Sequence, residues 1–130
     1  MATFRAELNR VSGQIVDAAI KVHKAVGPGL LESAYQSCLA YELRRRGFTV
    51  DENVAIPLEY EELRIPVAYR TDMVVNQSVI VELKATRQIT EVHEAQLLTQ
   101  LAQGGYRVGL LINFHALRLK DGIRRRVNAF

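Results

Sequence analysis

Two short apolar runs separated by three polar residues constrain the fold of this chain more than any other stretch. Residues 70–75 and 79–84 are rich in β-branched side chains, and the polar residues 76–78 lie between them. Such runs on either side of a polar turn predict a β-hairpin. The simplest connection is a three-residue loop, or a bulge, which pairs Val75 with Val79 and so fixes which side chains oppose each other.

The predicted hairpin has two unlike faces. Its odd-numbered positions are mostly apolar, whereas its even-numbered positions include Arg70, Asp72, Glu82 and Lys84. Because side chains alternate between the faces of a strand, one face should lie on the core and the other should gather two carboxylates and an amine. Asp72 is expected opposite Glu82, with Cβ atoms about 4.5–5.5 Å apart.

Two carboxylates at that separation repel each other unless a cation or a proton lies between them. A hard divalent ion, Mg²⁺ or Mn²⁺, suits such an all-oxygen site, with Asp72 and Glu82 as ligands and the Leu83 carbonyl as a further oxygen. Lys84 shares the face and could orient or deprotonate a water, or stabilise the transition state of phosphodiester cleavage. The alternative is an exposed lattice of ion pairs on a solvated sheet face.

The remaining elements follow from hydrophobic periodicity and from helix start and stop signals. Helices are expected over residues 4–25, 30–46 and 90–103, and further strands over residues 48–60 and 106–114. The tail, residues 117–127, is predicted to be a short basic hairpin or an edge segment. The order α-α-β-β-β-α-β predicts an α/β mixed sheet with helices packed against it, in one domain spanning residues 1–130.

The second predicted helix carries an acid in its first turn. Its buried stripe is expected at Leu31, Ala34, Cys38 and Tyr41. Glu32 either stabilises the helix dipole, by about 0.3–1 kcal/mol, or supplies a third carboxylate to the same metal. Both interpretations stay open on the residues alone.

The third predicted helix begins at a capping residue, Thr90, and carries a neutral polar stripe. His93, Gln96, Gln100 and Gln103 lie three, four and three residues apart, so they line one side of the helix. Such a stripe can contact phosphates, or orient a metal-bound water, without adding charge. The alternative is a plain solvent face, which we favour for Gln103.

The net charge and the cysteine content limit the partners and the cellular compartment that this chain can have. The net charge of +3 is compatible with nucleic acid as a partner. The arginines at 44–46 and 124–126, with Lys120, could follow a phosphate backbone or be ordinary solvated surface. The single cysteine, Cys38, excludes an internal disulfide and fits the reducing cytoplasm. The chain has no apolar run near the roughly 18 residues that a membrane span needs, and its start lacks the apolar segment of a signal peptide. We therefore expect a cytoplasmic protein with no membrane partner.

Four segments together resemble a known family. Residues 29–35 read Gly-x-x-Glu-x-x-Tyr, and with residues 81–85, 95–98 and 108–114 the chain resembles the GxxExxY proteins. These are a prokaryotic family placed in the PD-(D/E)XK nuclease superfamily, and the resemblance extends from about residue 15 to residue 127. It implies the restriction-endonuclease-like fold, a central mixed sheet flanked by helices.

The resemblance also implies roles for individual residues. Asp72, Glu82 and Lys84 would form the catalytic motif, with Glu32 as the acid of the preceding helix. Gln96 is similar to the glutamine that RecB-like nucleases carry on the helix after the motif strand. Gln100 stands where these relatives usually carry a tyrosine, so the stacking or phosphate contact of that tyrosine is not implied here.

The leading hypothesis is a Mg²⁺- or Mn²⁺-dependent nuclease that hydrolyses phosphodiester bonds through an activated water, with DNA favoured over RNA as the substrate. The alternative is a catalytically silent module of the same fold that binds nucleic acid or a protein partner. A homodimer or a partner chain would then help to complete a usable groove. Reaction on a small phosphorylated molecule is a third hypothesis that the residues leave open.

Overall fold

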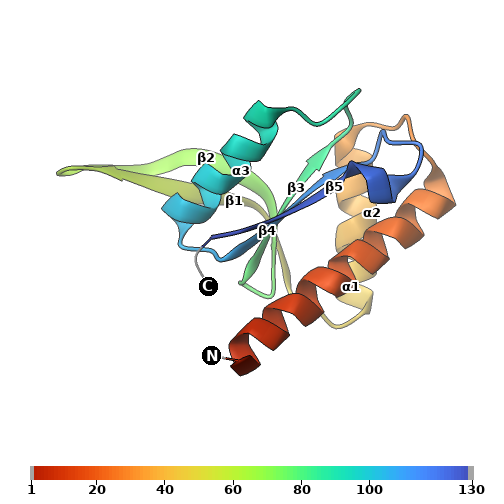
Figure 1. Ribbon diagram of the computed structural model, residues 1–130, viewed down its shortest axis with the longest axis horizontal. Helices are drawn as coiled ribbons and strands as arrows, with labels where there is room; N and C mark the ends of the chain where they lie inside the picture. Colours follow the sequence, from red (N-terminus) through yellow and green to blue (C-terminus); the bar gives the residue numbers. More distant parts are fainter. Residues whose placement is uncertain (1, 129–130) are drawn as a thin grey trace.

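Five strands form one mixed sheet, in which the strands lie side by side in their order along the chain (Figure 1). The computed structural model describes residues 2–128. The strands are β1 (Val50–Tyr60), β2 (Leu63–Val75), β3 (Val79–Lys84), β4 (Val108–Asn113) and β5 (Ile123–Val127). Neighbouring strands are antiparallel except for β3 and β4, which are parallel and are joined by a helical crossover.

Helices cover both faces of the sheet. α1 (Ala2–Val26) and α2 (Glu32–Arg45) pack on one face, and α3 (Glu91–Gly104) packs on the other (Figure 1). A 3₁₀ turn, η1 (Leu119–Gly122), leads into β5. This element order confirms the predicted fold class and shows that the basic tail ends as an antiparallel edge strand beside β4.

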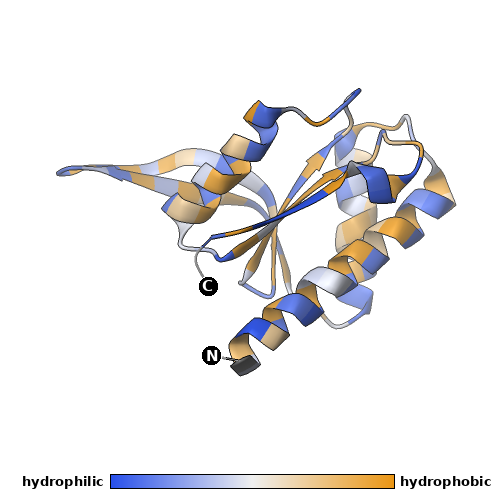
Figure 2. Cartoon of the chain, in the orientation of Figure 1, coloured by the Kyte–Doolittle hydropathy of each residue, from blue (hydrophilic) through white to orange (hydrophobic). Residues whose placement is uncertain are grey.

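The central hairpin has the predicted register. Val75 pairs with Val79, so the loop has three residues, and Asn76 and Gln77 adopt left-handed φ angles of 50° and 56°. The even-numbered face, however, is not wholly polar, because Val74 and Ile80 are buried beneath α3. The solvated lattice of ion pairs is therefore the wrong interpretation for this part of the face. Figure 2 shows the resulting concentration of hydrophobic residues in the central strands.

β1 and β2 exchange the faces that they present to the two helical layers. Val50 and Met73 pack with α1 and α2, whereas Ile56 and Tyr69, which have the same parities, pack with α3. In β1, Asn53 lies between Val50 and Ile56 and has a left-handed φ of 54°. Simple alternation therefore fails across this point, and odd-numbered side chains of β2 reach the face that carries the even-numbered acids.

The buried side of α2 differs from the predicted stripe. Leu31 and Tyr41 are 77% and 63% exposed, and the side chains that face the sheet are Tyr35, Leu39 and Leu43. The predicted core stripe is thus wrong for Leu31 and Tyr41, whereas Cys38 is partly buried and packs against the core. The helix faces the sheet along the line i, i+4, i+8 that starts at Tyr35.

Tyr35 is fully buried because its hydroxyl is satisfied. The hydroxyl donates to the Gly27 carbonyl at 2.6 Å and accepts from the Leu30 amide at 3.0 Å, while the ring stacks on Phe114 at a centroid distance of 4.4 Å. The tyrosine of the Gly-x-x-Glu-x-x-Tyr segment therefore anchors the loop that precedes α2, and with it the position of Glu32.

The ends of α3 follow the predicted signals. The Thr90 hydroxyl accepts from the His93 amide, and His93 Nδ1 accepts from the Thr90 amide at 3.1 Å, which together form a capping box. Gly105 ends the helix in a left-handed conformation, with φ 76°. Within residues 2–128, no helix is both long and apolar enough to cross a membrane.

Candidate active site

Asp72 and Glu82 meet where β2 and β3 separate. The backbone pairing of these strands ends at Met73 and Val81, and side chains then bridge the gap. Asp72 Oδ2 accepts from the Leu83 amide at 2.7 Å, and Glu82 Oε1 accepts from the Asp72 amide at 3.0 Å. Each acid thus binds the backbone of the opposite strand, which holds the two carboxylates side by side at the end of the hairpin.

Glu82 lies in a nearly closed environment. Its residue is 3% exposed, Oε1 accepts from the Thr71 hydroxyl at 2.6 Å, and Oε2 accepts from the Tyr69 hydroxyl at 3.3 Å. Burial, followed by the charge of Asp72, raises the pKa of Glu82 to about 7, although the hydrogen bonds from Thr71 and Asp72 and the charge of Lys84 oppose this. The Glu82 carboxyl is therefore poised to gain or lose a proton near neutral pH.

The pKa of Asp72 is set by burial and by three neighbouring residues. Burial raises the pKa of Asp72, the Leu83 amide lowers it, the charge of Glu32 raises it, and the charge of Lys84 lowers it. Glu32 Oε2 accepts from the Ala85 amide at 3.1 Å, so the first turn of α2 is bound to the end of β3. The structure therefore brings Glu32, Asp72, Glu82 and Lys84 into one electrostatic neighbourhood.

Lys84 is half-buried at the last position of β3, beside Asn113 of β4. Within residues 2–128, its ammonium forms no salt bridge with an acid, although its charge lowers the pKa of both Asp72 and Glu82. The charge of Lys84 thus acts on both acids, but its ammonium is paired with neither. The ammonium is therefore available to an incoming anion.

The donor set fits a hard divalent cation. The pKa values of Asp72 and Glu82 are raised by burial and by like charge, the two conditions that a bound cation relieves. Among residues 2–128, no group of three or more His, Cys, Asp or Glu side chains is arranged to hold a metal. Mg²⁺ tolerates this because it commonly binds through one or two carboxylates and keeps several waters. Asp72 and Glu82 would then be the side-chain ligands, and Glu32 lies close enough for its charge to raise the pKa of Asp72.

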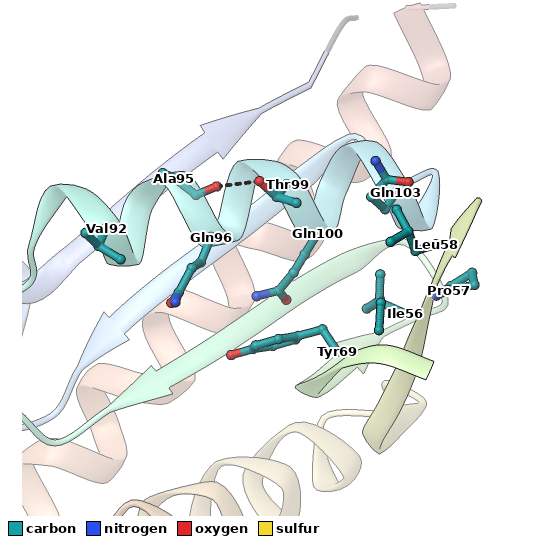
Figure 3. A pocket seen from close by; sticks show the side chains of 11 residues that line it. Ile56, Pro57, Leu58, Tyr69, Val92, Ala95, Gln96, Thr99, Gln100 and Gln103 are labelled. Atoms are coloured by element: carbon teal, nitrogen blue, oxygen red, sulfur yellow. Dashed lines mark hydrogen bonds between the residues drawn. The ribbon is translucent and has the colours of Figure 1, made fainter. Parts of the chain in front are cut away.

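The stripe predicted on α3 divides into two parts. His93 serves the helix cap, whereas Gln96, Gln100 and Gln103 line an apolar groove between α3 and the β1–β2 hairpin (Figure 3). Gln100 is 3% exposed, while Gln96 and Gln103 are exposed. The groove shares Tyr69 with the carboxylate site, because the Tyr69 hydroxyl donates to Glu82.

Three residues of the site were not predicted. Tyr69 and Thr71 sit at odd positions of β2 and reach Glu82 only because the strand exchanges faces. Gln36 donates to the Asp72 carbonyl at 3.1 Å and to Glu52 at 3.1 Å. Its position one helical turn after Glu32 was a usable signal, since residues i and i+4 share a helix face.

The arginine clusters are partly engaged within the protein. Arg44 pairs with Glu52, Arg46 pairs with both Asp17 and Glu42, and Arg126 pairs with Glu94. These three arginines therefore form ion pairs within the protein.

The raised pKa of Glu82 predicts a pH-dependent stability. Between pH 4.5 and about 7 the folded protein holds a proton on Glu82 that the unfolded chain releases, so stability falls as pH rises through this window. A Glu82→Gln substitution keeps an acceptor and removes the buried charge. We expect the substitution to be more stabilising at pH 8 than at pH 5. Its effect on the free energy of unfolding should be more favourable at pH 8 by on the order of 2 kcal/mol.

Urea unfolding at both pH values in the presence of a chelator measures this difference. Glu62→Gln, at an exposed acid, is the matched control and should leave the pH dependence unchanged. Identical pH dependence in the wild type and the Glu82→Gln variant would contradict the assignment of this window to Glu82.

Comparison with known proteins gives one family. The family model described as the PD-(D/E)XK nuclease superfamily matches residues 9–126. No curated protein and no solved structure gave a significant match. The narrower resemblance to the GxxExxY proteins stays a prediction, whereas a nuclease-type function and the general use of divalent metals are properties of the matched superfamily. Since the match covers most of the chain and agrees with the mixed sheet and its flanking helices, the protein belongs to the PD-(D/E)XK nuclease superfamily.

Proposed function

We propose that this protein is a Mg²⁺- or Mn²⁺-dependent nuclease that hydrolyses phosphodiester bonds, with DNA favoured over RNA. The observation that carries the proposal is the reciprocal bonding of Asp72 and Glu82 across the open end of the hairpin. This bonding holds the buried Glu82 carboxylate and the half-buried Asp72 carboxylate together against their mutual repulsion, an arrangement that a bound cation stabilises.

A divalent ion held by Asp72 and Glu82, with the Leu83 carbonyl as a further oxygen, would supply Lewis-acid stabilisation of phosphate charge and an acidified water. The protein's own groups do the rest. The Lys84 ammonium donates hydrogen bonds to a phosphate oxygen on which charge develops. The Tyr69 hydroxyl, whose pKa burial and the charge of Glu82 raise to about 12, stays protonated and keeps Glu82 oriented. Glu32, on α2, adds negative charge that favours cation entry.

The test is cleavage of labelled single-stranded and double-stranded DNA and RNA with Mg²⁺, with Mn²⁺ and with a chelator. Lys84→Ala is expected to lower the cleavage rate by about 10²–10³-fold, because a preorganised cation facing the transition state is lost. Lys24→Ala, at an exposed lysine of α1, is the control and should retain the wild-type rate. Cleavage that is equal in both variants, or that persists unchanged in the chelator, would count against the proposal.

One observation favours a catalytically silent module as the second candidate. Asp72 Oδ2 and Glu82 Oε1 are both used in bonds that hold β2 to β3, which is a sufficient structural reason for the two acids. Calorimetric titration with Mn²⁺ separates the candidates. A nuclease gives saturable binding that Asp72→Asn weakens, whereas a silent module binds nucleic acid with no dependence on divalent ions.

A further inference from the structure

A neutral groove lies directly beside the carboxylate site. We call it the Tyr69 groove; Ile56, Leu58, Tyr69, Ala95, Gln96 and Gln100 are among the residues that line it, and its volume is about 380 Å³. Its walls come from α3 on one side and from β1 and β2 on the other, and Figure 3 shows Gln96 and Gln100 extending from the helix toward Tyr69. None of its lining residues is charged. A phosphate or a carboxylate therefore finds no counter-ion there, and a flat, uncharged group is the better occupant.

Gln100 gives the Tyr69 groove an unmet hydrogen-bonding capacity. The residue is 3% exposed, and its Oε1 is buried without a hydrogen-bond partner among the described residues. A buried acceptor without a donor is unfavourable unless a ligand supplies the donor. Gln96 and Gln103 add exposed amides along the same side of α3. Amide side chains present both donors and acceptors, as do the edges of nucleobases.

Tyr69 joins the groove to the proposed chemistry. Its ring lines the groove, while its hydroxyl donates to Glu82 Oε2 at 3.3 Å. A group that lies against this ring is therefore adjacent to the carboxylates. Aromatic rings that carry unstacked bases are a recurrent means of binding single-stranded nucleic acid.

We propose that the Tyr69 groove receives an unpaired nucleobase of the substrate strand, next to the phosphate that is cleaved. The base lies against the Tyr69 ring and the apolar wall, and one of its N–H groups donates to Gln100 Oε1. This inference rests on the proposed nuclease function and adds a substrate class to it. Because a paired base is held in the stack of its duplex, the groove selects single-stranded or unpaired segments.

Binding in the absence of cleavage tests the inference. Fluorescence anisotropy in a chelator compares labelled single-stranded and duplex oligonucleotides, in DNA and RNA forms. We expect wild-type protein to bind the single strand at least about tenfold more tightly than the duplex, in keeping with stacking on one aromatic side chain. Ala95→Trp, which fills the groove, should abolish this difference. Ala102→Trp, at an exposed α3 position outside the groove, should preserve it.

A second variant tests the buried amide. Gln100→Met removes the unpaired acceptor at similar size, so thermal stability should be unchanged or higher while affinity for the single strand falls about tenfold. If Gln100 only filled space, affinity would not change. Equal affinity of the wild type for single strand and duplex, or equal behaviour of Ala95→Trp and Ala102→Trp, would overturn the inference. A failure of metal-dependent cleavage with the binding pattern intact would instead refute only the proposed catalysis.

Discussion

An Asp72→Asn variant is expected to cleave at least about 10³-fold more slowly than the wild type while remaining folded. The carboxamide oxygen can still accept from the Leu83 amide, so the bond that links β2 to β3 at this point is kept. The negative charge is lost, however, and with it a proposed ligand for the cation, whose stabilisation of phosphate charge is worth several kcal/mol. The rate at saturating Mn²⁺, measured by single-turnover cleavage, gives the size of the effect.

The same substitution has a second, independent readout. The charge of Asp72 is the largest cause after burial of the raised pKa of Glu82, so removing it should lower that pKa from about 7. Carboxyl-detected NMR titration of the Glu82 side chain measures the change. Asp51→Asn, at an exposed acid of β1, is the control for both readouts. A comparable loss of cleavage in the control, or an unmoved Glu82 pKa, would contradict the coupled site.

Tyr35→Ala should lower the free energy of unfolding by about 3–5 kcal/mol, the range for truncating a fully buried aromatic side chain. The substitution empties a site against Phe114 and leaves the Gly27 carbonyl and the Leu30 amide without their hydroxyl partner. Tyr35→Phe keeps the ring and should cost only about 0.5–1.5 kcal/mol. Urea unfolding monitored by circular dichroism gives both values.

Tyr41 on the same helix provides the comparison. It is 63% exposed and contacts Arg45 through its ring, so Tyr41→Ala should change stability by less than about 1 kcal/mol. Equal destabilisation by Tyr35→Ala and Tyr41→Ala would show that the loop before α2 is not anchored as described. The contrast also tests the predicted core stripe of α2, which placed Tyr41 rather than Tyr35 on the buried side.

Local signals made much of the fold predictable. The register of the β2–β3 hairpin follows from two β-branched runs and a three-residue loop, and the start and end of α3 follow from Thr90 and Gly105. These features depend on residues close together in the chain. The adjacency of Asp72 and Glu82 was accessible for the same reason, because it needs only the correct hairpin pairing.

The parts that escaped prediction depend on distant packing. Which side of α2 faces the sheet is decided by the stack of Tyr35 on Phe114, 79 positions away in the chain by their numbering. The roles of Tyr69 and Thr71 depend on the exchange of faces in β1 and β2, which is marked by the left-handed backbone of Asn53. Alternation along a single strand contains no information about such an exchange.

The cross-strand bonds of Asp72 and Glu82 would give these two acids a structural role as well as the proposed catalytic one. Where the ladder of main-chain bonds stops, the carboxylates themselves tie one strand to the next. Truncating either acid to alanine would therefore remove a bond between β2 and β3 together with a proposed metal ligand. A loss of stability and a loss of catalysis could then not be separated. Carboxamide replacements preserve the tether and remove only the charge, so an inert yet intact form of this protein is best sought among them.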